Sequence, residues 1–541
     1  MHSSLYCAAI AGAGARLVEV QVDLALGLPG FHLVGLPDHA CNDARTRVLT
    51  ALRNTGYQLP QKKITVNLAP GDLRKEGVGF DLAIALGILA AAGLTPLPER
   101  TPLVVGELAL SGEVLAVRGV LPVALEARKR GFEGLIVPEQ NAPEGALVQG
   151  IRVYGARTLA EAAETFCGTG GRPPATAPQE TAPATALDLA DVRGQQTAKW
   201  ALEVAAAGGH NALFIGPPGA GKTMLARRFS GLLPALSFEE AVEATSIWSV
   251  AGRLTPGQGL MPARPFRAPH HTISVAGLIG GGSPLRPGEI SLAHRGVLFL
   301  DELPEFGHAA LEALRQPLED GKVSLVRAKD RATMPARFML LGAMNPCPCG
   351  HASDADPDRC TCTLPAKENY MRRISGPILD RFDLHIEVGA LRTKDFLALP
   401  QGEASAAVRE RVEACRALQR RRFAQFPDLH CNAQLSGPAL RKLVGASDAA
   451  RSLLARFIDE KGLSARAHDR MLKLARTIAD LHGHEHVGEQ HVQGAVQLRC
   501  LDSPTTGRPD RIRMAPLQLA RRAALQPPPG TSPGAIPREG T

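Results

Sequence analysis

Gly216-Pro217-Pro218-Gly219-Ala220-Gly221-Lys222-Thr223 fits the phosphate-loop pattern G-x-x-x-x-G-K-[ST]. An apolar run, residues 212–215, precedes it and a helical run begins at Met224, so we expect a strand, a loop and a helix. Glycines let such a loop curl until its N–H groups face phosphate oxygens, and the helix N-terminus adds partial positive charge. Residues 216–224 are therefore predicted to bind ATP, with Lys222 on the β- and γ-phosphates and the Thr223 hydroxyl on Mg²⁺.

A second motif, Asp301-Glu302, follows the apolar run 297–300. Four apolar residues predict a buried strand of a parallel sheet, whose carboxyl end is where α/β sheets place ligands. Asp301 is predicted to hold Mg²⁺ through water, and Glu302 to orient and polarise the attacking water. The next apolar strand, 338–343, ends near Asn345, whose amide is predicted to hold the lytic water.

Length, composition and charge limit the class of protein. A chain of 541 residues exceeds what one hydrophobic core supports, so we expect two to four domains. Its 45% hydrophobic content is typical of a folded soluble protein, and a formal charge of +8 is compatible with an acidic partner such as nucleic acid. There is no apolar run of 18 residues and no signal peptide pattern at the N-terminus. These features predict a cytoplasmic protein with no membrane partner.

The fold class predicted from these patterns is α/β. In the first third of the chain, residues 17–24 and 64–68 indicate strands, residues 81–92 a buried helix and Ser111-Gly112 a hairpin turn. Apolar residues recur with a helical period across 437–499. The predicted organisation is an N-terminal α/β domain at 1–168, a Pro/Ala/Thr-rich linker at 169–186, a parallel-sheet ATPase domain at 187–392, an α-helical lid at 393–500 and a disordered tail at 501–541.

The N-terminal domain carries the motifs Lys75-Glu76-Gly77, Gly106-Glu107-Leu108 and Arg130-Gly131-Phe132. They resemble the S5-type proteolytic domain of the Lon family, whose active members pair a serine nucleophile with a lysine base. In this alignment the serine position falls near Gly79 and the lysine position near Leu121, and no serine occurs between residues 75 and 92. The resemblance implies a Lon-like fold without proteolysis, acting in partner binding or assembly.

The ATPase half resembles AAA+ proteins. Asn345 matches the residue called sensor 1 in that group. In the magnesium-chelatase and MCM branches, the arginine that matches Arg381 reaches into the neighbouring subunit's site and stabilises charge on the transferring phosphoryl group. An ordinary salt bridge of Arg381 with Asp380 or Asp383 is the alternative interpretation.

A predicted helix begins after Ser464, which is a reasonable N-cap. The AAA+ resemblance assigns Arg466 to sensor 2, an arginine that contacts the γ-phosphate, although Arg470 lies one turn away and is easily confused with it. Four histidines follow this helix, and we interpret them as a solvated loop rather than a metal site: His482, His484, His486 and His491.

Two insertions interrupt the ATPase pattern. One holds Phe266-Arg267-Ala268-Pro269-His270-His271-Thr272 and a glycine-rich run, 280–284. In the other, residues 322–327 and 333–337 flank a polar tip, which predicts a β-hairpin. Such paired insertions resemble those of magnesium-chelatase and MCM-type ATPases, where they line the pore of a ring. An ordinary solvated hairpin is the alternative to a DNA-binding tip made by Arg327, Lys329 and Arg331.

Two C-x-C pairs lie within residues 346–363, at Cys347, Cys349, Cys360 and Cys362. Four thiolates in a Pro/Gly-rich loop match a structural tetrahedral Zn²⁺ site, where metal replaces the core that a short loop lacks. Free thiols are the alternative, whereas disulfides are not expected in a reducing compartment.

The Lon-like domain and the motifs FRAPHHTIS (266–274), MNPCPCG (344–350) and SGPILDRFD (375–383) together resemble the magnesium-chelatase-like AAA+ ATPases of the YifB and ComM type. The resemblance covers all but the tail. It implies a homo-hexameric ring that uses ATP and Mg²⁺ to move on branched or single-stranded DNA without sequence preference, as a helicase or branch-migration motor in transformation or recombination. The alternatives are a magnesium-chelatase motor subunit and an ATP-regulated protein-remodelling module.

Overall fold

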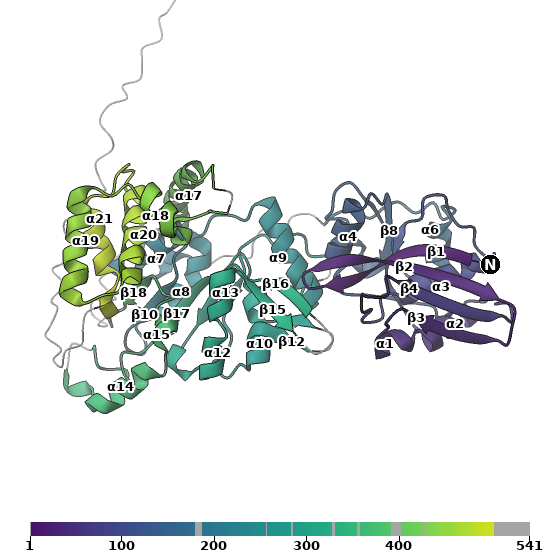
Figure 1. Cartoon of the computed structure of the whole chain (residues 1–541), viewed down its shortest axis with the longest axis horizontal. Coiled ribbons are helices and arrows are strands. Elements are labelled where there is room, and N and C mark those ends of the chain that lie inside the picture. Colours follow the sequence, from purple (N-terminus) through teal and green to yellow (C-terminus); the bar gives the residue numbers. More distant parts are fainter. Residues whose placement is uncertain are drawn as a thin grey trace, which may run out of the picture. The chain divides into compact units, whose positions relative to one another are not determined.

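The computed structural model describes residues 2–178, 187–255, 257–282, 285–326, 331–353, 357–390, 402–426 and 428–502 (Figure 1). Several predicted features fall wholly or partly outside this range: the tip residues Arg327 and Lys329, the linker beyond residue 178, the start of the helical lid at 393–401 and the tail beyond residue 502. Arg331 is described only as part of a strand. The chain divides into two compact units, residues 1–416 and 417–541, and each is described by itself.

A seven-stranded mixed sheet forms the N-terminal domain, in the order β3-β4-β2-β1-β5-β8-β9. Side chains along β4 alternate between buried and partly exposed, because successive residues of a strand face opposite sides. β1 and β2 form a long antiparallel hairpin, while β5 runs parallel to β1. The strands are β1 (His2–Ala11), β2 (Gly14–Ala25), β3 (Gly30–Val34), β4 (Lys63–Ala69), β5 (Leu103–Val104), β8 (Gly134–Pro138) and β9 (Arg152–Ala156), with a separate hairpin of β6 (Glu107–Leu108) and β7 (Val114–Leu115).

Six helices belong to this domain, and α3 is the most deeply buried of them, with ten of its eleven residues inside. This agrees with its alanine-rich, uniformly apolar sequence. The strands predicted at 17–24 and 64–68, the helix at 81–92 and the turn at 111–112 are confirmed. The helices are α1 (His39–Asn42), α2 (Ala44–Asn54), α3 (Asp81–Ala91), α4 (Val120–Lys129), α5 (Ala142–Gly145) and α6 (Leu159–Phe166).

The ATPase domain is built on five parallel strands in the order β11-β14-β17-β10-β18. The predicted α/β fold with a parallel sheet is therefore confirmed. All carboxyl ends of these strands lie at one edge, which brings the loops after β10, β14 and β17 together. The strands are β10 (Ala212–Ile215), β11 (Phe266–Arg267), β14 (Val297–Leu300), β17 (Met339–Met344) and β18 (Leu384–Glu387).

Each insertion contains a small hairpin, and the one predicted at residues 322–337 is confirmed. One pairs β12 (Gly280–Gly281) with β13 (Arg286–Pro287), and the other pairs β15 (Lys322–Val326) with β16 (Arg331–Pro335). The helices of this part are α7 (Gln196–Gly208), α8 (Lys222–Phe229), α9 (Phe238–Ala251), α10 (Val275–Ile279), α11 (Glu289–Leu292), α12 (His308–Glu312), α13 (Arg315–Asp320), α14 (Leu364–Arg372), α15 (Gly376–Leu379) and α17 (Ser405–Arg422).

The second unit is helical, as predicted, with α18 (Gly437–Leu443), α19 (Asp448–Lys461), α20 (Ala465–Leu481) and α21 (Glu489–Gln497). Ser464 caps α20 by accepting the backbone N–H of Ala467, which confirms the predicted N-cap. Buried Arg476 pairs with Asp480 one turn along this helix. Among the described residues, none of the helices combines the length and apolarity needed to cross a bilayer.

Candidate functional site

The loop between β10 and α8 lies at the carboxyl edge of the parallel sheet. Gly219 and Gly221 have φ angles of 75° and 92°, in the left-handed region that glycine adopts without steric cost. Helix α8 begins at Lys222, so the N–H groups of its first turn have no intrahelical partners. A curled loop followed by a helix N-terminus suits a phosphate group.

The Lys222 ammonium folds back over this loop. It donates to the carbonyl oxygens of Gly216 at 2.6 Å and Pro217 at 2.9 Å, and to Asn345 Oδ1 at 3.0 Å. Burial lowers the pKa of Lys222, while the carboxylate of Asp301 opposes that shift. The predicted phosphate-binding lysine and the predicted sensor 1 amide are therefore in direct contact.

Thr223, Asp301 and Glu302 also meet. Thr223 Oγ1 donates to Asp301 Oδ2 at 2.6 Å, and Asp301 Oδ1 accepts the backbone N–H of Glu302 at 3.0 Å. A hydroxyl and a carboxylate are hard oxygen ligands of the kind that Mg²⁺ prefers, and here they lie within hydrogen-bonding distance. The residues present therefore fit this metal.

Two residues outside the predicted site support it. Gln195, at φ 53°, donates from Nε2 to the carbonyl oxygens of Ala220 at 3.2 Å and Gly389 at 2.7 Å, and so links the phosphate loop to the end of β18. The Tyr370 hydroxyl hydrogen-bonds the backbone of Asn345, and burial raises the pKa of Tyr370 to about 12. Neither contact has a local sequence signal, because each joins distant segments of the chain.

Glu302 has a further partner that the sequence did not assign. It lies at φ 54°, and its side chain is 60% exposed. Its Oε2 atom is 3.5 Å from Nδ1 of His271. The His271 ring lies edge-on to Phe306, with centroids 6.4 Å apart, and 4.1 Å from the ring of His270. His271 belongs to the FRAPHHTIS motif, which marked the family without giving this residue a role.

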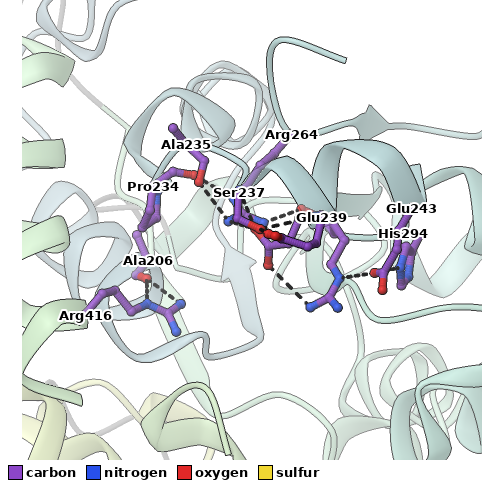
Figure 2. A network of polar contacts seen from close by, with 11 residues as sticks. Ala206, Pro234, Ala235, Ser237, Glu239, Glu243, Arg264, His294 and Arg416 are labelled. Atoms are coloured by element: carbon purple, nitrogen blue, oxygen red, sulfur yellow. Dashed lines mark hydrogen bonds and ion pairs between the residues drawn. The ribbon is translucent and has the colours of Figure 1, made fainter. Parts of the chain in front are cut away.

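A polar network fixes the turn before β14 (Figure 2). Arg264, whose side chain is 16% exposed, donates to the carbonyl oxygens of Pro234 and Arg295, both at 2.7 Å. It also donates to Glu240 Oε2 at 2.8 Å. The guanidinium therefore ties the segment before α9, the first turn of α9 and the residue that leads into β14.

The same network holds an ionised glutamate against a neutral histidine (Figure 2). His294 Nδ1 accepts the backbone N–H of Arg337 at 3.0 Å, so its proton is on Nε2, which donates to Glu243 Oε2 at 3.2 Å. That bond and one from Arg295 lower the pKa of Glu243 to about 2. Burial lowers the pKa of His294. These contacts join α9 to both β14 and the base of the β15–β16 hairpin.

Arg381 lies after α15, close to the start of β18, and forms an ion pair with Glu319 of α13. Its side chain is 20% exposed. The sequence named Asp380 and Asp383 as candidate partners but not Glu319, which is 62 residues upstream. Asp383 Oδ2 lies 3.5 Å from His210 Nδ1.

The two sensor 2 candidates differ in exposure. Arg466 is exposed on the first turn of α20, whereas Arg470 is buried one turn later. Both belong to the second unit, so the assignment of Arg466 to the γ-phosphate stays a prediction.

The four cysteines of residues 346–363 converge. Their sulfur atoms all lie within 4.8 Å of one another, with Cys347 Sγ 3.4 Å from Cys349 Sγ and 3.8 Å from Cys360 Sγ. Tetrahedral Zn–S bonds place sulfurs about 3.8 Å apart, so the donor set fits zinc. The loop also touches the phosphate loop, since a Cβ atom on Gly350 would lie 2.5 Å from Pro218 Cδ.

The histidines after α20 are only partly a solvated loop. His482 and His484 are exposed, but His491 is buried, because α21 packs its apolar face against α20. His491 Nδ1 accepts the backbone N–H of Gly488 at 2.9 Å, which puts its proton on Nε2, and Nε2 lies 2.9 Å from His484 Nδ1. In this arrangement His491 Nε2 donates a hydrogen bond and has no lone pair for a metal. The expectation of a solvated loop was therefore wrong for His491.

Three family models match the chain. They are described as magnesium chelatase subunit ChlI (residues 188–396), subunit ChlI of Mg-chelatase (20–141) and magnesium chelatase subunit ChlI C-terminal (402–499). Together they span the N-terminal domain, the ATPase domain and the helical unit.

Three of the relatives are similar over most of their length, and a fourth over about a third of it. The competence protein ComM of Haemophilus influenzae is 44% identical over 92% of this chain and 97% of its own length, and the uncharacterised protein YifB of Escherichia coli is 44% identical over the same shares. An uncharacterised protein of Mycobacterium tuberculosis, Rv2897c, is 45% identical over 91% of this chain and 98% of its own. The DNA repair protein RadA of Escherichia coli is 32% identical over 28% of this chain and 32% of its own length.

Proposed function

Because the chain belongs to the magnesium-chelatase-like AAA+ family of the ComM and YifB type, which implies ATPase activity, we propose that it is a ring motor that couples ATP hydrolysis to movement on DNA. The convergence of Lys222, Thr223, Asp301 and Asn345 carries the ATPase part of this proposal. The motor would open or migrate branched DNA in recombination or natural transformation.

Each residue has a defined part in hydrolysis. Lys222 exchanges its carbonyl partners for phosphate oxygens, and Asn345 holds the attacking water. Thr223 and Asp301 would hold Mg²⁺, which neutralises charge on the phosphates when bound. Glu302 polarises the water, and its exposed carboxylate at the edge of the sheet supports that role.

Action on DNA is supported by the names of two relatives, ComM and the DNA repair protein RadA, and by the net charge of +8. We assign the grip on DNA to the β15–β16 hairpin, through Arg327, Lys329 and Arg331. Basic side chains there would neutralise phosphates without reading sequence, so binding should weaken as salt rises.

The proposed role of Arg381 makes assembly into a ring necessary for ATP hydrolysis. We propose that Arg381 acts as a finger residue in the site of a neighbouring subunit, so that hydrolysis requires a homo-oligomer, a hexamer. Arg466 would complete the site from the helical lid by contacting the γ-phosphate.

The direct test is phosphate release by the purified protein with no DNA, single-stranded DNA and a four-way junction, alongside Glu302→Gln. We expect DNA to stimulate hydrolysis and the variant to lose it. We expect DNA stimulation to be lost when Lys329 and Arg331 are both replaced by alanine and to be kept when the exposed Arg315 is replaced. That result would assign the DNA contact to the hairpin. Hydrolysis that is indifferent to every DNA would contradict the motor proposal.

A second candidate is a chelatase-type motor that acts on a protein partner, and the three ChlI family models favour it. Its ATP site would use the same residues. DNA-indifferent hydrolysis that a protein partner stimulates would support this candidate or a protein-remodelling role.

The N-terminal domain is proposed to be a Lon-like module without proteolysis. Leu121, at the predicted lysine position, is fully buried, and its N–H is bound by Glu144 Oε1 at 2.8 Å. The Glu144 carboxylate also accepts a hydrogen bond from Ser249 of α9, which joins the domain to the ATPase. Casein cleavage by the purified protein that survives Lys222→Ala would contradict this assignment.

The cysteine cluster is proposed to hold structural Zn²⁺. Elemental analysis should find about one zinc per chain in the wild type and little in Cys349→Ser. The exposed Cys500→Ser serves as the matched control and should keep the metal. Four freely reactive thiols and no zinc in the wild-type protein would refute the site.

A further inference from the structure

The cysteine loop, residues 346–363, begins and ends beside the ATP site. It starts directly after Asn345, whose Oδ1 accepts a hydrogen bond from Lys222 Nζ at 3.0 Å. It ends at Thr363, which caps α14 by accepting the backbone N–H of Ala366. Tyr370 of that helix hydrogen-bonds the backbone of Asn345. The chain therefore leaves the phosphate-binding lysine, passes through the four cysteines and returns to the same place.

Backbone N–H groups inside the cysteine loop face its sulfur atoms. Those of Gly350 and Ala352 hydrogen-bond the sulfur of Cys347, and the N–H of Cys349 donates to Cys362 Sγ at 3.4 Å. Hydrogen bonds to sulfur favour the thiolate, which is the form of cysteine that binds a metal. The backbone of this turn is therefore shaped around the four sulfurs, and Gly350 is part of that turn.

Gly350 lies where this turn meets the phosphate loop. Its φ angle is 85°, in the left-handed region that glycine adopts without steric cost. A Cβ atom built on Gly350 would lie 2.5 Å from Cδ and 2.8 Å from Cγ of Pro218. Carbon atoms in contact are about 3.5–4.0 Å apart, so only a residue without a Cβ atom fits against the Pro218 ring. The backbone of the cysteine loop is therefore packed directly on the phosphate loop.

The phosphate loop needs supports that remain when nucleotide binds. Lys222 Nζ now donates to the carbonyl oxygens of Gly216 and Pro217, and it would leave both for phosphate oxygens. Gln195 Nε2 donates to another carbonyl oxygen of the loop at 3.2 Å, and Gly350 packs on its tip. Phosphate displaces neither of these two contacts, so both can keep the loop curled in the bound state.

We infer that the cysteine loop is a positioning element of the ATP site, in which Gly350 supports Pro218 and a metal held by the four cysteines fixes Gly350. Among the described residues of this loop only Cys347 and Gly350 are buried, so the loop has no hydrophobic core of its own. Such a loop takes its shape from the metal, and loss of the metal frees Gly350 and lets the phosphate loop open. ATP and the metal therefore bind cooperatively. This inference rests on the proposed zinc and ATP sites and links one to the other.

The first test is the affinity of Gly350→Ala for a fluorescent, non-hydrolysable ATP analogue in the presence of Mg²⁺. The added methyl group displaces Pro218 without touching the nucleotide. We expect the Kd for the analogue to rise about tenfold, which corresponds to about 1.4 kcal/mol. Elemental analysis should find the zinc content of the variant unchanged, because Gly350 contributes no ligand atom.

Two variants separate the contact from the strain of alanine at a positive φ angle. Gly56 has φ 86°, and a Cβ atom on it would meet nothing within 4 Å, so Gly56→Ala carries the same backbone strain without a collision and should keep wild-type affinity. Pro218→Ala removes the Cγ and Cδ atoms that the new methyl group would strike. Adding Gly350→Ala to Pro218→Ala should therefore change the Kd less than twofold.

The second test measures retention of the metal rather than ATP binding. By linkage, a metal that strengthens ATP binding about tenfold is itself bound about tenfold more tightly when the nucleotide is present. The concentration of the zinc chelator TPEN that removes half of the zinc from the wild type should rise about tenfold when the ATP analogue is saturating. In Gly350→Ala it should rise less than threefold. If that variant holds no zinc, the wild-type titration decides alone.

The outcomes distinguish this inference from the proposals on which it rests. Equal affinities of Gly350→Ala and Gly56→Ala for the analogue, in a wild-type protein that holds zinc and binds ATP, would overturn the inference alone. Zinc retention that the analogue leaves unchanged would do the same. A wild-type protein without zinc would refute the metal site together with the inference and leave ATP hydrolysis untouched, whereas a protein that binds no ATP analogue would refute the proposed function as well.

Discussion

Arg264 offers the sharpest test of how the ATP site is held in place. Replacing it by alanine removes hydrogen bonds to two carbonyl oxygens at 2.7 Å, a third to Ala235 at 3.3 Å and the ion pair with Glu240. Breaking a buried pair costs about 3–5 kcal/mol. Glu240 keeps Arg295 Nη1 at 3.3 Å, so we expect the lower end, about 3 kcal/mol.

The readout should be local, because a chain of several compact units does not unfold in one step. Hydrogen exchange of the β14 amides, residues 297–300, reports the opening of the strand that carries Asp301. A loss of 3 kcal/mol should speed their exchange by about 100-fold. Arg264→Lys, which keeps the charge but not the planar fork, should give an intermediate effect.

The matched control is Arg315→Ala, an exposed arginine at the start of α13 whose ion pair with Glu312, at the end of α12, spans 2.9 Å. Surface pairs of this kind contribute about 0.5 kcal/mol, so the exchange of β14 should change by no more than about threefold. If Arg264→Ala left the exchange of β14 within that same range, the network would not hold the strand and the reasoning would fail.

The described contacts also predict the pH dependence of unfolding, the concentration dependence of ATPase activity and the affinity for ATP. The pKa of Glu243 is lowered from 4.5 to about 2 and that of His294 is lowered from 6.5, so both side chains bind fewer protons in the folded than in the unfolded state. The melting temperature should therefore fall as pH drops below about 6.5, and Glu243→Gln should weaken the pH dependence of the melting temperature below about pH 4.5. Glu319→Gln removes one ion-pair partner of Arg381 and should lower the protein concentration for half-maximal ATPase activity about two- to fivefold. An unchanged or raised concentration would contradict competition between Glu319 and a neighbouring subunit for Arg381. Lys222→Ala should weaken binding of a fluorescent ATP analogue about 10- to 100-fold, and retention of affinity would remove the lysine from the site.

The sequence was most informative where chemistry is local. The phosphate loop fits into eight consecutive residues, and Asp301 with Glu302 follows a run of four apolar residues, so both could be read directly from the chain. The parallel sheet then determines that their carboxyl ends meet, because parallel strands of one sheet share an edge.

What the sequence could not provide depends on register and on the packing of distant segments. His271 lies near Glu302 because it follows β11, which pairs with β14, the strand that leads to Glu302, 31 residues further along the chain. Glu319 reaches Arg381 from a helix that is 62 residues upstream. The burial of His491 depends on how α21 packs on α20, which the periodicity of a single helix does not reveal.

The most direct test of the central claim is movement on DNA. A labelled four-way junction with homologous arms, incubated with the protein and ATP, should be converted to separated duplex products. The junction should remain intact when the Glu302→Gln variant is used or when ATP is omitted. A protein that binds the junction and hydrolyses ATP in its presence but leaves the junction intact at every protein concentration would contradict the motor and leave only a DNA-stimulated ATPase.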